Sequence, residues 1–445
     1  MTPPVEALDE LVALVREGRL EAFIARAYQL EPPDLADVLA SLDVEARLTL
    51  VRALPPELSS KALIELPADQ HPESIVAALD SFQAAEIVEE LEDDDAADLL
   101  GELPPAERDR ILAGLPEHGD LDRLLGYSQD TAGGLMTTQV VTVMQLDTVG
   151  LALEAVRRQA EDLEDVGEIF VIDTERRLVG RLAFKNLVVN PAGRLVREVM
   201  DLAPMSVPPD EDQEDVARLM ARYDLPALPV LDASGRLLGQ ITYDDVIDVT
   251  QAEATEDLLR FGGVSPDEEL GARWRAAVRS RLPWLYLNLL TAFLAGAVVL
   301  FFQGAITRLT TLAVWMPIIA GMGGNAGTQA LAVSVRRLSL GQVSIDRART
   351  IIIKETLVGL INGLAIGVVV SGVSVLVGQP WRLGLVVFLA MTGNLLVAGL
   401  AGASIPVILE RLDIDPAVAS SIFVTTFTDV CGFGLLLGLA SVMLL

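Results

Sequence analysis

The sequence of 445 residues has one cysteine, Cys431, and two histidines, His71 and His118. These side chains cannot build a disulfide framework or a Cys/His zinc site. A bound metal would therefore need carboxylate, carbonyl or water oxygens, the ligands that suit Mg²⁺, Ca²⁺ or Mn²⁺. No basic stretch followed by an apolar run opens the chain, so we expect no cleaved signal peptide.

Basic residues are scarce, and they are unevenly distributed. The chain has 33 Lys and Arg against 63 Asp and Glu. From Leu282 onward there are 8 basic and 6 acidic residues, which leaves 25 basic and 57 acidic residues, a net charge of −32, in Met1–Arg281. We expect no nucleic acid partner for so acidic a surface and expect divalent cations to bind it. This contrast in charge between an acidic half and a nearly neutral half indicates at least two domains.

Five long windows in the second half have the roughly 20 apolar residues that a membrane-spanning helix needs. They are Leu282–Thr307, Leu309–Val335, Thr356–Pro380, Leu383–Leu409 and Pro416–Leu445. Basic residues precede the first window and follow the second, so the positive-inside rule places the N-terminal half in the cytoplasm. An odd number of spans puts the C-terminus outside. We therefore expect a multi-pass protein of the lipid bilayer.

Asp429, near the middle of the last window, is the first candidate for function. A carboxylate at that depth costs about 2.5–3.5 kcal/mol, so it normally faces water or a partner and not lipid. No Lys or Arg lies between Pro416 and Leu445 to pair with it. A cation in a pore would be its natural partner. The alternative is a protonated Asp that is hydrogen-bonded inside a helix bundle.

The second window is rich in glycine and polar residues. Pro317 and four glycines within eleven residues are poor for a regular helix, and irregular backbone in lipid requires protein or a water-filled cavity around it. Small residues also allow close helix packing, which is the alternative. Packing does not explain Asn325, Thr328 and Gln329, whose oxygens can accept hydrogen bonds from a hydrated cation. Asn394 adds a polar group to the fourth window.

Two internal repeats organise the acidic half. Val38–Pro67 recurs 49 residues later as Ile87–Pro116, which indicates a stacked helical solenoid. The acidic run Glu89–Asp95 lies between, and such a run alone is usually a solvated face. Phe170–Leu187 recurs 59 residues later as Pro229–Val246. Each copy of this second repeat has a strand, a turn, a strand and a helix.

The second repeat resembles a tandem pair of CBS modules, a common nucleotide or ligand sensor. A helix is expected before each copy, at Thr148–Ala160 and Gln213–Tyr223. The second copy has Thr242 and Asp245 where related modules hold a ribose and phosphates, whereas the first has Ala183 and Asn186. ATP binding at the second copy is therefore one hypothesis, and a purely structural pair is the other.

An amphipathic helix over Asp248–Phe261 is expected to leave the sensor, before Gly262 and Gly263 end it. Its exposed acidic residues are Asp248, Glu253, Glu256 and Asp257. Such a helix can transmit a change in the sensor to the membrane or can be a passive tether.

Together these features resemble the MgtE family of magnesium channels over nearly the whole chain. The most specific motifs are Gly323–Gln329, Asp415–Ala417, Thr428–Val430, Thr131–Thr137 and Glu253–Asp257. The resemblance implies a multidomain fold with an α-helical solenoid N domain, an α/β tandem CBS pair, a connecting helix and an all-α transmembrane domain of five helices. We place these parts at 1–130, 131–250, 251–281 and 282–445.

The resemblance also implies a homodimeric Mg²⁺ channel of the plasma (inner) membrane, which is not an enzyme. Asp429 would select the ion in the pore, and we expect the pore also to include Asn325, Gly324, Gly327, Thr328 and Asn394. Cytoplasmic Mg²⁺ would bind Asp94, Asp98, Asp248, Glu253, Glu256 and Asp257 and close the pore. Ser421 stands where some members have an amide residue, so no pore role is carried over to it.

Three alternatives remain from the residues. A channel of the same build could carry Co²⁺ or Mn²⁺, because the ligands are oxygens in each case. A CBS-regulated anion channel also joins such modules to a membrane domain, but Asp429 argues against it. A membrane-bound enzyme or sensor would need a nucleophile–base pair or a phosphate loop, and the sequence has neither.

Overall fold

The computed structural model describes residues 5–116, 118–159, 168–202, 204–265, 274–339, 348–412, 414 and 420–445. It divides into two compact units, Met1–Gln251 and Ala252–Leu445, which we call the acidic unit and the bundle unit. The predicted motif Asp415–Ala417 lies outside the described residues.

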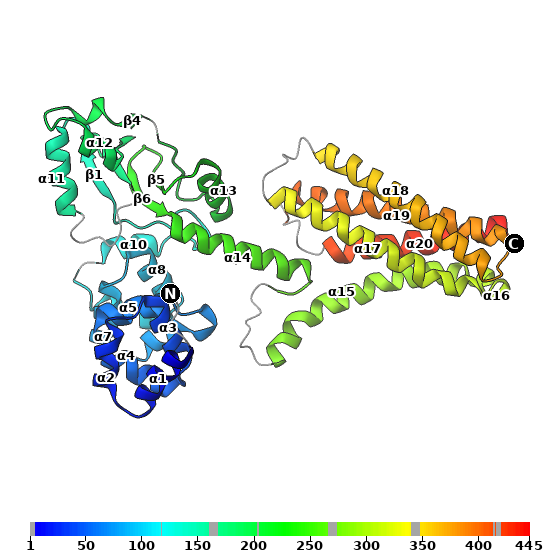
Figure 1. The fold of residues 1–445 in the computed structure, drawn as a ribbon, viewed down its shortest axis with the longest axis horizontal. Coiled ribbons are helices and arrows are strands. Elements are labelled where there is room, and N and C mark those ends of the chain that lie inside the picture. Colours follow the sequence, from blue (N-terminus) through cyan, green and yellow to red (C-terminus); the bar gives the residue numbers. More distant parts are fainter. Residues whose placement is uncertain are drawn as a thin grey trace. The chain divides into compact units, whose positions relative to one another are not determined.

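Short helices form the first part of the acidic unit (Figure 1). They are α1 (Val5–Arg16), α2 (Leu20–Ala27), α3 (Pro32–Ala40), α4 (Val44–Ala53), α5 (Pro56–Ile64), α6 (Pro72–Ala77), α7 (Ser81–Glu89), α8 (Asp93–Gly101), α9 (Pro105–Leu112) and α10 (Gly119–Leu124). Proline at the first or second position starts α3, α5, α6 and α9, where a missing N–H costs nothing. The Asp43 and Asp80 side chains cap α4 and α7 by accepting backbone N–H bonds.

The sequence repeat is visible in the core of these helices. Val38 and Leu39 of α3 are fully buried, and their counterparts Ile87 and Val88 of α7 are at most 3% exposed. Both pairs belong to one continuous apolar core. Stacking of successive helices therefore buries equivalent positions of each repeat, which confirms the predicted helical solenoid.

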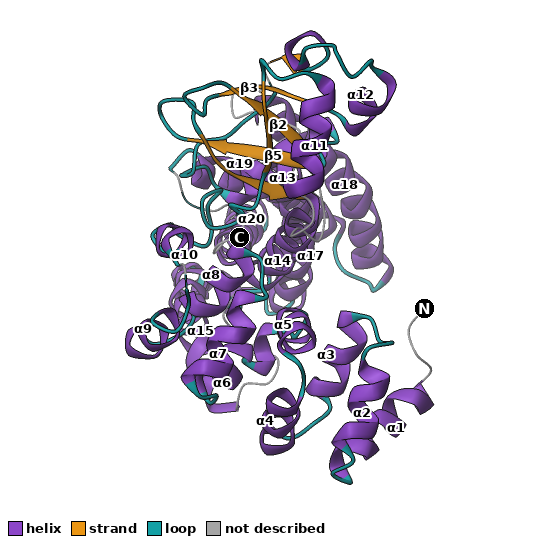
Figure 2. Ribbon diagram, turned by 90° about the vertical axis from the view of Figure 1, so that its left-hand side faces the viewer, coloured by secondary structure: helices purple, strands orange, loops and turns teal. Residues whose placement is uncertain are grey.

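The rest of the acidic unit contains two α/β modules (Figure 2). The first has β1 (Val141–Met144), α11 (Val149–Gln159), β2 (Ile169–Ile172), β3 (Leu178–Arg181), α12 (Phe184–Val189) and β4 (Asp201–Leu202). Its sheet order is β1-β2-β3-β4, with β1 and β2 parallel and the other pairs antiparallel. The second has α13 (Gln213–Tyr223), β5 (Ala227–Leu231), β6 (Leu237–Thr242) and α14 (Tyr243–Phe261). The predicted pair of α/β modules is confirmed.

The helix that leaves the second module begins earlier than expected. The predicted start was Asp248, but α14 runs without a break from Tyr243. No glycine or proline lies between these residues, so the last helix of the module and the connecting helix form one element. The helix ends as expected, where Gly263 adopts a φ of 73° that favours glycine.

Long helices make up the bundle unit (Figure 1). They are α15 (Trp274–Phe301), α17 (Leu312–Ser339), α18 (Ala348–Leu376), α19 (Trp381–Glu410) and α20 (Ser420–Met443), with the short α16 (Gln303–Arg308) between the first two. Helix α19 is the most buried of the spans and packs against α17, α18 and α20. Four of the described helices, α15, α18, α19 and α20, are long and apolar enough to cross a membrane.

Helix α17 has 28 residues but is less apolar, because glycine and amide residues occupy its middle. The count of five spans therefore stays a prediction. The expectation of irregular backbone in this segment is wrong, since α17 is one helix from Leu312 to Ser339. Two of its glycines, Gly323 and Gly327, serve close packing instead. A Cβ on Gly327, for example, would meet the Val424 side chain of α20 at 2.5 Å.

Candidate functional site

The acidic unit contains a cavity of about 510 Å³ between the N-terminal helices and the second α/β module. Nine carboxylates and one ammonium group, that of Lys61, line it. The acidic residues are Glu65, Glu89, Glu90, Glu92, Asp94, Asp95, Asp244, Asp245 and Asp248. We call this space the acidic cavity. Carboxylates at such density repel one another unless cations lie among them.

Asp94 is the least solvated of these carboxylates. Its side chain lies in the first turn of α8, is 7% exposed, and its Oδ1 has no hydrogen-bond partner among the described residues. Burial, and then the nearby Asp245 and Asp95, raise the pKa of Asp94 well above its ordinary value. A buried anionic oxygen without a partner is costly, so this position favours a bound cation or a proton.

Two neighbours of Asp94 have the same property. Burial and the charge of Asp245 raise the pKa of Asp95 to about 7. Burial raises the pKa of Asp245 to about 6, although a hydrogen bond from the Thr242 hydroxyl opposes the rise. Each raised pKa reports a carboxylate whose ionised form is poorly compensated, so the three together favour a bound cation or protons.

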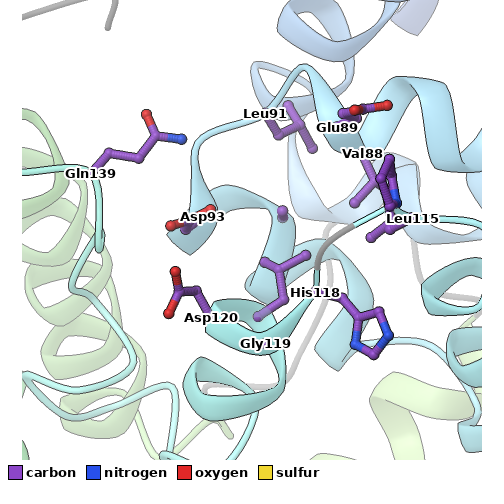
Figure 3. Close-up of a pocket in the computed structure, with 12 residues that line it drawn as sticks. Val88, Glu89, Leu91, Asp93, Leu115, His118, Gly119, Asp120 and Gln139 are labelled. Atoms are coloured by element: carbon purple, nitrogen blue, oxygen red, sulfur yellow. The ribbon is translucent and has the colours of Figure 1, made fainter. Parts of the chain in front are cut away.

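A second cavity of about 790 Å³ adjoins the first, and Glu89, Leu91 and Gln139 line both. Figure 3 shows the Asp93 and Asp120 carboxylates entering it from α8 and α10, opposite Gln139. Asp93 accepts a hydrogen bond from the Thr138 hydroxyl, which ties α8 to the segment that precedes β1. Both cavities therefore depend on how the N-terminal helices meet the α/β modules.

The structure brings only some of the predicted Mg²⁺-sensing residues to the acidic cavity. Asp94 and Asp248 line it. Asp98 lies one turn after Asp94 on α8, where its carboxylate accepts a hydrogen bond of 3.4 Å from Gln129. Glu253, Glu256 and Asp257 lie further along α14, and Glu256 forms an ion pair with Arg260. These three residues belong to the bundle unit.

Thr242 and Asp245 were predicted as a nucleotide site, and their surroundings favour a cation. The Thr242 hydroxyl donates a hydrogen bond of 2.6 Å to Asp245 Oδ2, so the two groups already satisfy one another. Both residues line the acidic cavity, where phosphates would meet the other carboxylates. The nucleotide assignment to this pair stays a prediction.

In the bundle unit, Asp429 occupies the middle of α20. Its side chain is partly exposed and has no hydrogen bond or ion pair with another described residue. The hydroxyl of the preceding Thr428 donates to the Thr425 carbonyl of its own helix. The carboxylate of Asp429 is therefore available to a ligand.

The predicted pore residues of α17 lie on different faces of that helix. Asn325 and Gln329 are exposed, Gly324 and Thr328 are partly exposed, and Gly327 is buried. A Cβ on Gly327 would lie 3.5 Å from the Thr428 side chain, next to Asp429 in sequence. The structure thus places Gly327 of α17 against the segment of α20 that carries the acid.

Asn394 of α19 differs from the other candidates because it is fully buried within the bundle. Its Nδ2 donates a hydrogen bond of 2.9 Å to the Ile319 carbonyl of α17, while its Oδ1 has no partner among the described residues. Gly323 and Gly432 leave the space that the amide fills. Its contacts indicate an interhelical hydrogen bond between α19 and α17, and its place in the pore stays a prediction.

Sequence reasoning missed several carboxylates of the acidic cavity. Glu65 of α5 is one, and burial followed by the charge of Asp248 raises its pKa. Asp95 is another, and Asp245 was assigned to a nucleotide and not to a cation. Asp245 aligned with Asn186 in the repeat, so the sequence did mark the position as specific to the second copy. The sequence did not indicate that Asp245 lies near α8.

Within the described residues, no three His, Cys, Asp or Glu side chains form a group that could hold a metal ion by themselves. This geometry still fits Mg²⁺, because that ion keeps several of its waters and binds proteins through one or two carboxylates. The acidic cavity has room for such a hydrated ion, and the unpartnered Oδ1 of Asp94 is a suitable direct or water-mediated ligand.

Comparisons with known proteins match all three parts of the chain. Residues 30–130 match the MgtE intracellular N domain, residues 196–251 a CBS domain, and residues 316–439 the MgtE divalent cation transporter model. A magnesium transporter MgtE of Thermus thermophilus is 35% identical over 440 residues, 97% of each chain. That of Bacillus subtilis is 29% identical over 438 residues, which cover 98% of this chain and 97% of the relative.

A solved structure agrees with the sequence comparisons. The cytosolic domain of the Mg²⁺ channel MgtE in complex with ATP is 35% identical, with a TM-score of 0.52, and covers 54% of this chain and 99% of its own. These findings confirm the predicted family and, with it, a membrane protein that is a transporter and not an enzyme. The chain belongs to the MgtE family of magnesium transporters.

Proposed function

We propose that this protein imports Mg²⁺ across the plasma membrane and that cytoplasmic Mg²⁺ closes its pore by binding in the acidic cavity. The acidic cavity itself carries the proposal, because a bound cation stabilises its closely spaced carboxylates in their ionised form. Full-length relatives named as magnesium transporters support Mg²⁺ as the ion.

The gating step follows from where the carboxylates come from. Asp94 and Asp95 belong to the N-terminal helices, whereas Asp245 and Asp248 belong to α14 at the end of the second α/β module. A cation among them stabilises the arrangement in which these elements meet, and its loss leaves like charges facing one another. The cation can shift this equilibrium only by its preference for one of the two arrangements. Asp98, Glu253, Glu256 and Asp257 are proposed as further sites of the same kind.

Asp429 is proposed as the ion-selecting residue of the pore. A second copy of the chain would supply a second Asp429 and would cover Asn325, which is exposed on α17 in a single chain. An amide facing lipid is unfavourable, so its exposure supports a homodimer whose copies share the pore. A ring of carboxylate and amide oxygens selects cations over anions. The N-terminus would lie in the cytoplasm and the C-terminus outside, with five spans between.

We propose that the chain also binds ATP, because a relative of 35% identity was solved in complex with ATP. Co²⁺ or Mn²⁺ transport is the second candidate function, since the proposed ligands are oxygens for each of these ions.

Flux into liposomes tests the transport proposal. Purified full-length protein would be reconstituted, and uptake of Mg²⁺, Co²⁺, Mn²⁺ and chloride would be measured side by side against protein-free liposomes. We expect uptake of Mg²⁺ to exceed that of the other ions. Chloride flux without divalent uptake would contradict a cation pore, and faster Co²⁺ or Mn²⁺ uptake would reassign the substrate.

A further inference from the structure

A cavity of about 350 Å³ in the acidic unit has arginines in its wall, in contrast to the acidic cavity. Arg123 comes from α10, and Arg176 and Arg236 come from the β2–β3 and β5–β6 turns. Asp120 and Asp232 are the carboxylates among its lining residues. We propose that this cavity binds a phosphate-bearing anion, and we call it the arginine cavity.

Both carboxylates of the arginine cavity are already engaged. Asp120 forms an ion pair of 2.6 Å with Arg123. Asp232 Oδ1 accepts hydrogen bonds from the backbone N–H groups of Ser234 and Arg236, at 2.8 and 2.9 Å, and from the Ser234 hydroxyl. These bonds, that from the Ser234 hydroxyl first, lower the pKa of Asp232. Asp232 therefore stabilises its own turn through Oδ1, and these bonds hold its carboxylate within that turn.

Arg176 and Arg236 are not held by direct bonds within the described part of the chain, although the charge of Arg236 helps to lower the pKa of Asp232. Neither guanidinium group forms an ion pair or a hydrogen bond with another described residue. Arg177, next to Arg176, pairs with Glu175 at 2.7 Å instead. The cavity thus has two guanidinium groups that form no direct bond with a carboxylate of the described residues. A planar guanidinium matches the oxygens of a phosphate group in a bidentate geometry.

The internal repeat shows that Arg176 is a departure from the local pattern. Asp173 and Asp232 are 59 residues apart and cap equivalent turns. Gly235 has a φ of 82° in the second turn, and Arg176 has the equivalent φ of 63° in the first. This left-handed region favours glycine, so arginine carries a conformational cost there that glycine avoids. A charged side chain at this place is consistent with a binding role.

The two turns are also held against each other. The Leu178 N–H donates to the Gly235 carbonyl at 3.0 Å, and the Leu237 N–H donates to the Arg176 carbonyl at 3.2 Å. The backbones that carry Arg176 and Arg236 are therefore fixed in relation to one another before any ligand arrives. Such preorganisation reduces the entropy lost on binding.

Because the acidic half is strongly negative, an anion can be attracted only by the arginines that line the cavity. The net charge of −32 over Met1–Arg281 repels anions at long range, so attraction must come from groups that touch the ligand. A cavity of about 350 Å³ is near the small end of the range for small-molecule sites and suits a phosphate chain. Since Arg123 belongs to the N-terminal helices and the other two arginines to the α/β modules, a bound anion would join these parts.

Calorimetry on the full-length protein in detergent and magnesium-free buffer tests this inference. Inorganic triphosphate, ATP and adenosine would be titrated separately, to distinguish a phosphate chain from a nucleoside as the recognised group. The test variant combines Arg176→Gly, which copies Gly235 of the other turn, with Arg236→Ala. Arg158→Ala, an exposed arginine of α11 outside the cavity, is the matched control.

We expect triphosphate and ATP to bind the wild type, and adenosine not to bind. The double variant should have a Kd at least about tenfold weaker for both phosphate ligands, because hydrogen bonds to charged groups contribute at least that factor. The control should match the wild type. Absence of triphosphate binding, or equal binding by the double variant, would overturn the inference. If ATP alone still binds the double variant as tightly as the wild type, the arginine cavity is rejected while ATP binding itself stands.

Discussion

The two units of this protein use carboxylates in opposite ways. The acidic unit gathers nine of them around one cavity, whereas α20 of the bundle unit has one, Asp429. Many closely spaced acids, several with raised pKa values, respond to cation concentration, because each bound ion removes repulsion among its neighbours. A lone acid between apolar helices can admit a cation without holding it strongly, as a pore requires. In the proposed function, the acidic unit therefore senses cations and the bundle unit conducts them.

Removal of Asp429, the one carboxylate of α20, should have the largest effect on transport. Asp429→Ala should reduce Mg²⁺ uptake by liposomes to the rate of protein-free liposomes, since no carboxylate would remain in α20. The fold should survive, because the change removes an insertion cost of about 2.5–3.5 kcal/mol. Size-exclusion chromatography checks the fold, and Ser441→Ala on the same helix is the control. Wild-type uptake by Asp429→Ala would remove Asp429 from the pore.

The packing of the bundle offers the next largest effect. Gly359 of α18 touches Gly399 of α19, and a Cβ there would clash with the Leu395 carbonyl. Gly359→Ala should lower stability by about 2–3 kcal/mol, because overpacking at a rigid backbone contact forces the helices apart. Thermal unfolding in detergent measures the loss. Gly372→Ala, on the same helix but with open space at its Cβ, should be neutral or slightly stabilising. Equal effects of the two changes would contradict the close contact between α18 and α19.

The pH dependence of Mg²⁺ binding tests whether the ion binds at the carboxylates of the acidic cavity. Protons compete with Mg²⁺ at Asp95, with a pKa of about 7, and at Asp245, with a pKa of about 6. Lowering the pH from about 7.5 to about 6 should therefore weaken Mg²⁺ binding about tenfold, as one proton must be displaced per ion. Calorimetry in the two buffers measures it, and equal affinity at both pH values would contradict binding at these carboxylates.

The same raised pKa values predict how the stability of the Mg²⁺-free protein changes with pH. Folded carboxylates with raised pKa values bind more protons than unfolded ones, so stability should fall as the pH rises from about 4 towards about 7. Mg²⁺ should reduce this fall. A melting temperature that rises over that range in magnesium-free buffer would contradict the raised values.

The smallest predicted effect concerns a single carboxylate of the acidic cavity. Asp95→Asn should stabilise the Mg²⁺-free protein at about pH 7.5 by about 1 kcal/mol, judged by thermal unfolding. Relief of the repulsion that raises the Asp95 pKa outweighs the loss of a favourable charge in the first turn of α8, which is worth about 0.3–1 kcal/mol. Glu57→Gln, in the first turn of α5, loses only that charge and should be slightly destabilising. A destabilised Asp95→Asn would mean that Asp95 is only a helix-end charge.

Much of the fold was predictable because it depends on local patterns. Helix α13 was predicted at its observed bounds, and the repeats indicated both the solenoid and the α/β modules. The middle of α17 was expected to be irregular although the window was predicted as a spanning helix, because Gly323 and Gly327 contact neighbouring helices that a window of sequence does not contain. Local propensity is weaker than such tertiary packing.

The candidate site was predictable only in part for the same reason. Asp94 and Asp429 stood out as part of an acidic run and as a charge in an apolar window. The role of Glu65 and Asp245 depends on α5, α8 and α14 meeting at one cavity, and residues separated by that length of chain carry no joint sequence signal. The structure adds this meeting point, on which the proposed sensing role depends.

Closure of the pore by cytoplasmic Mg²⁺ is measured most directly in inside-out membrane patches that contain the full-length protein. Ion current would be recorded while Mg²⁺ on the cytoplasmic face is raised, for wild type and for a variant with Asp94→Asn, Asp95→Asn and Asp245→Asn. We predict that wild-type current falls as Mg²⁺ rises and that the variant stays open at concentrations that close the wild type. Identical closure of the two proteins would contradict sensing in the acidic cavity.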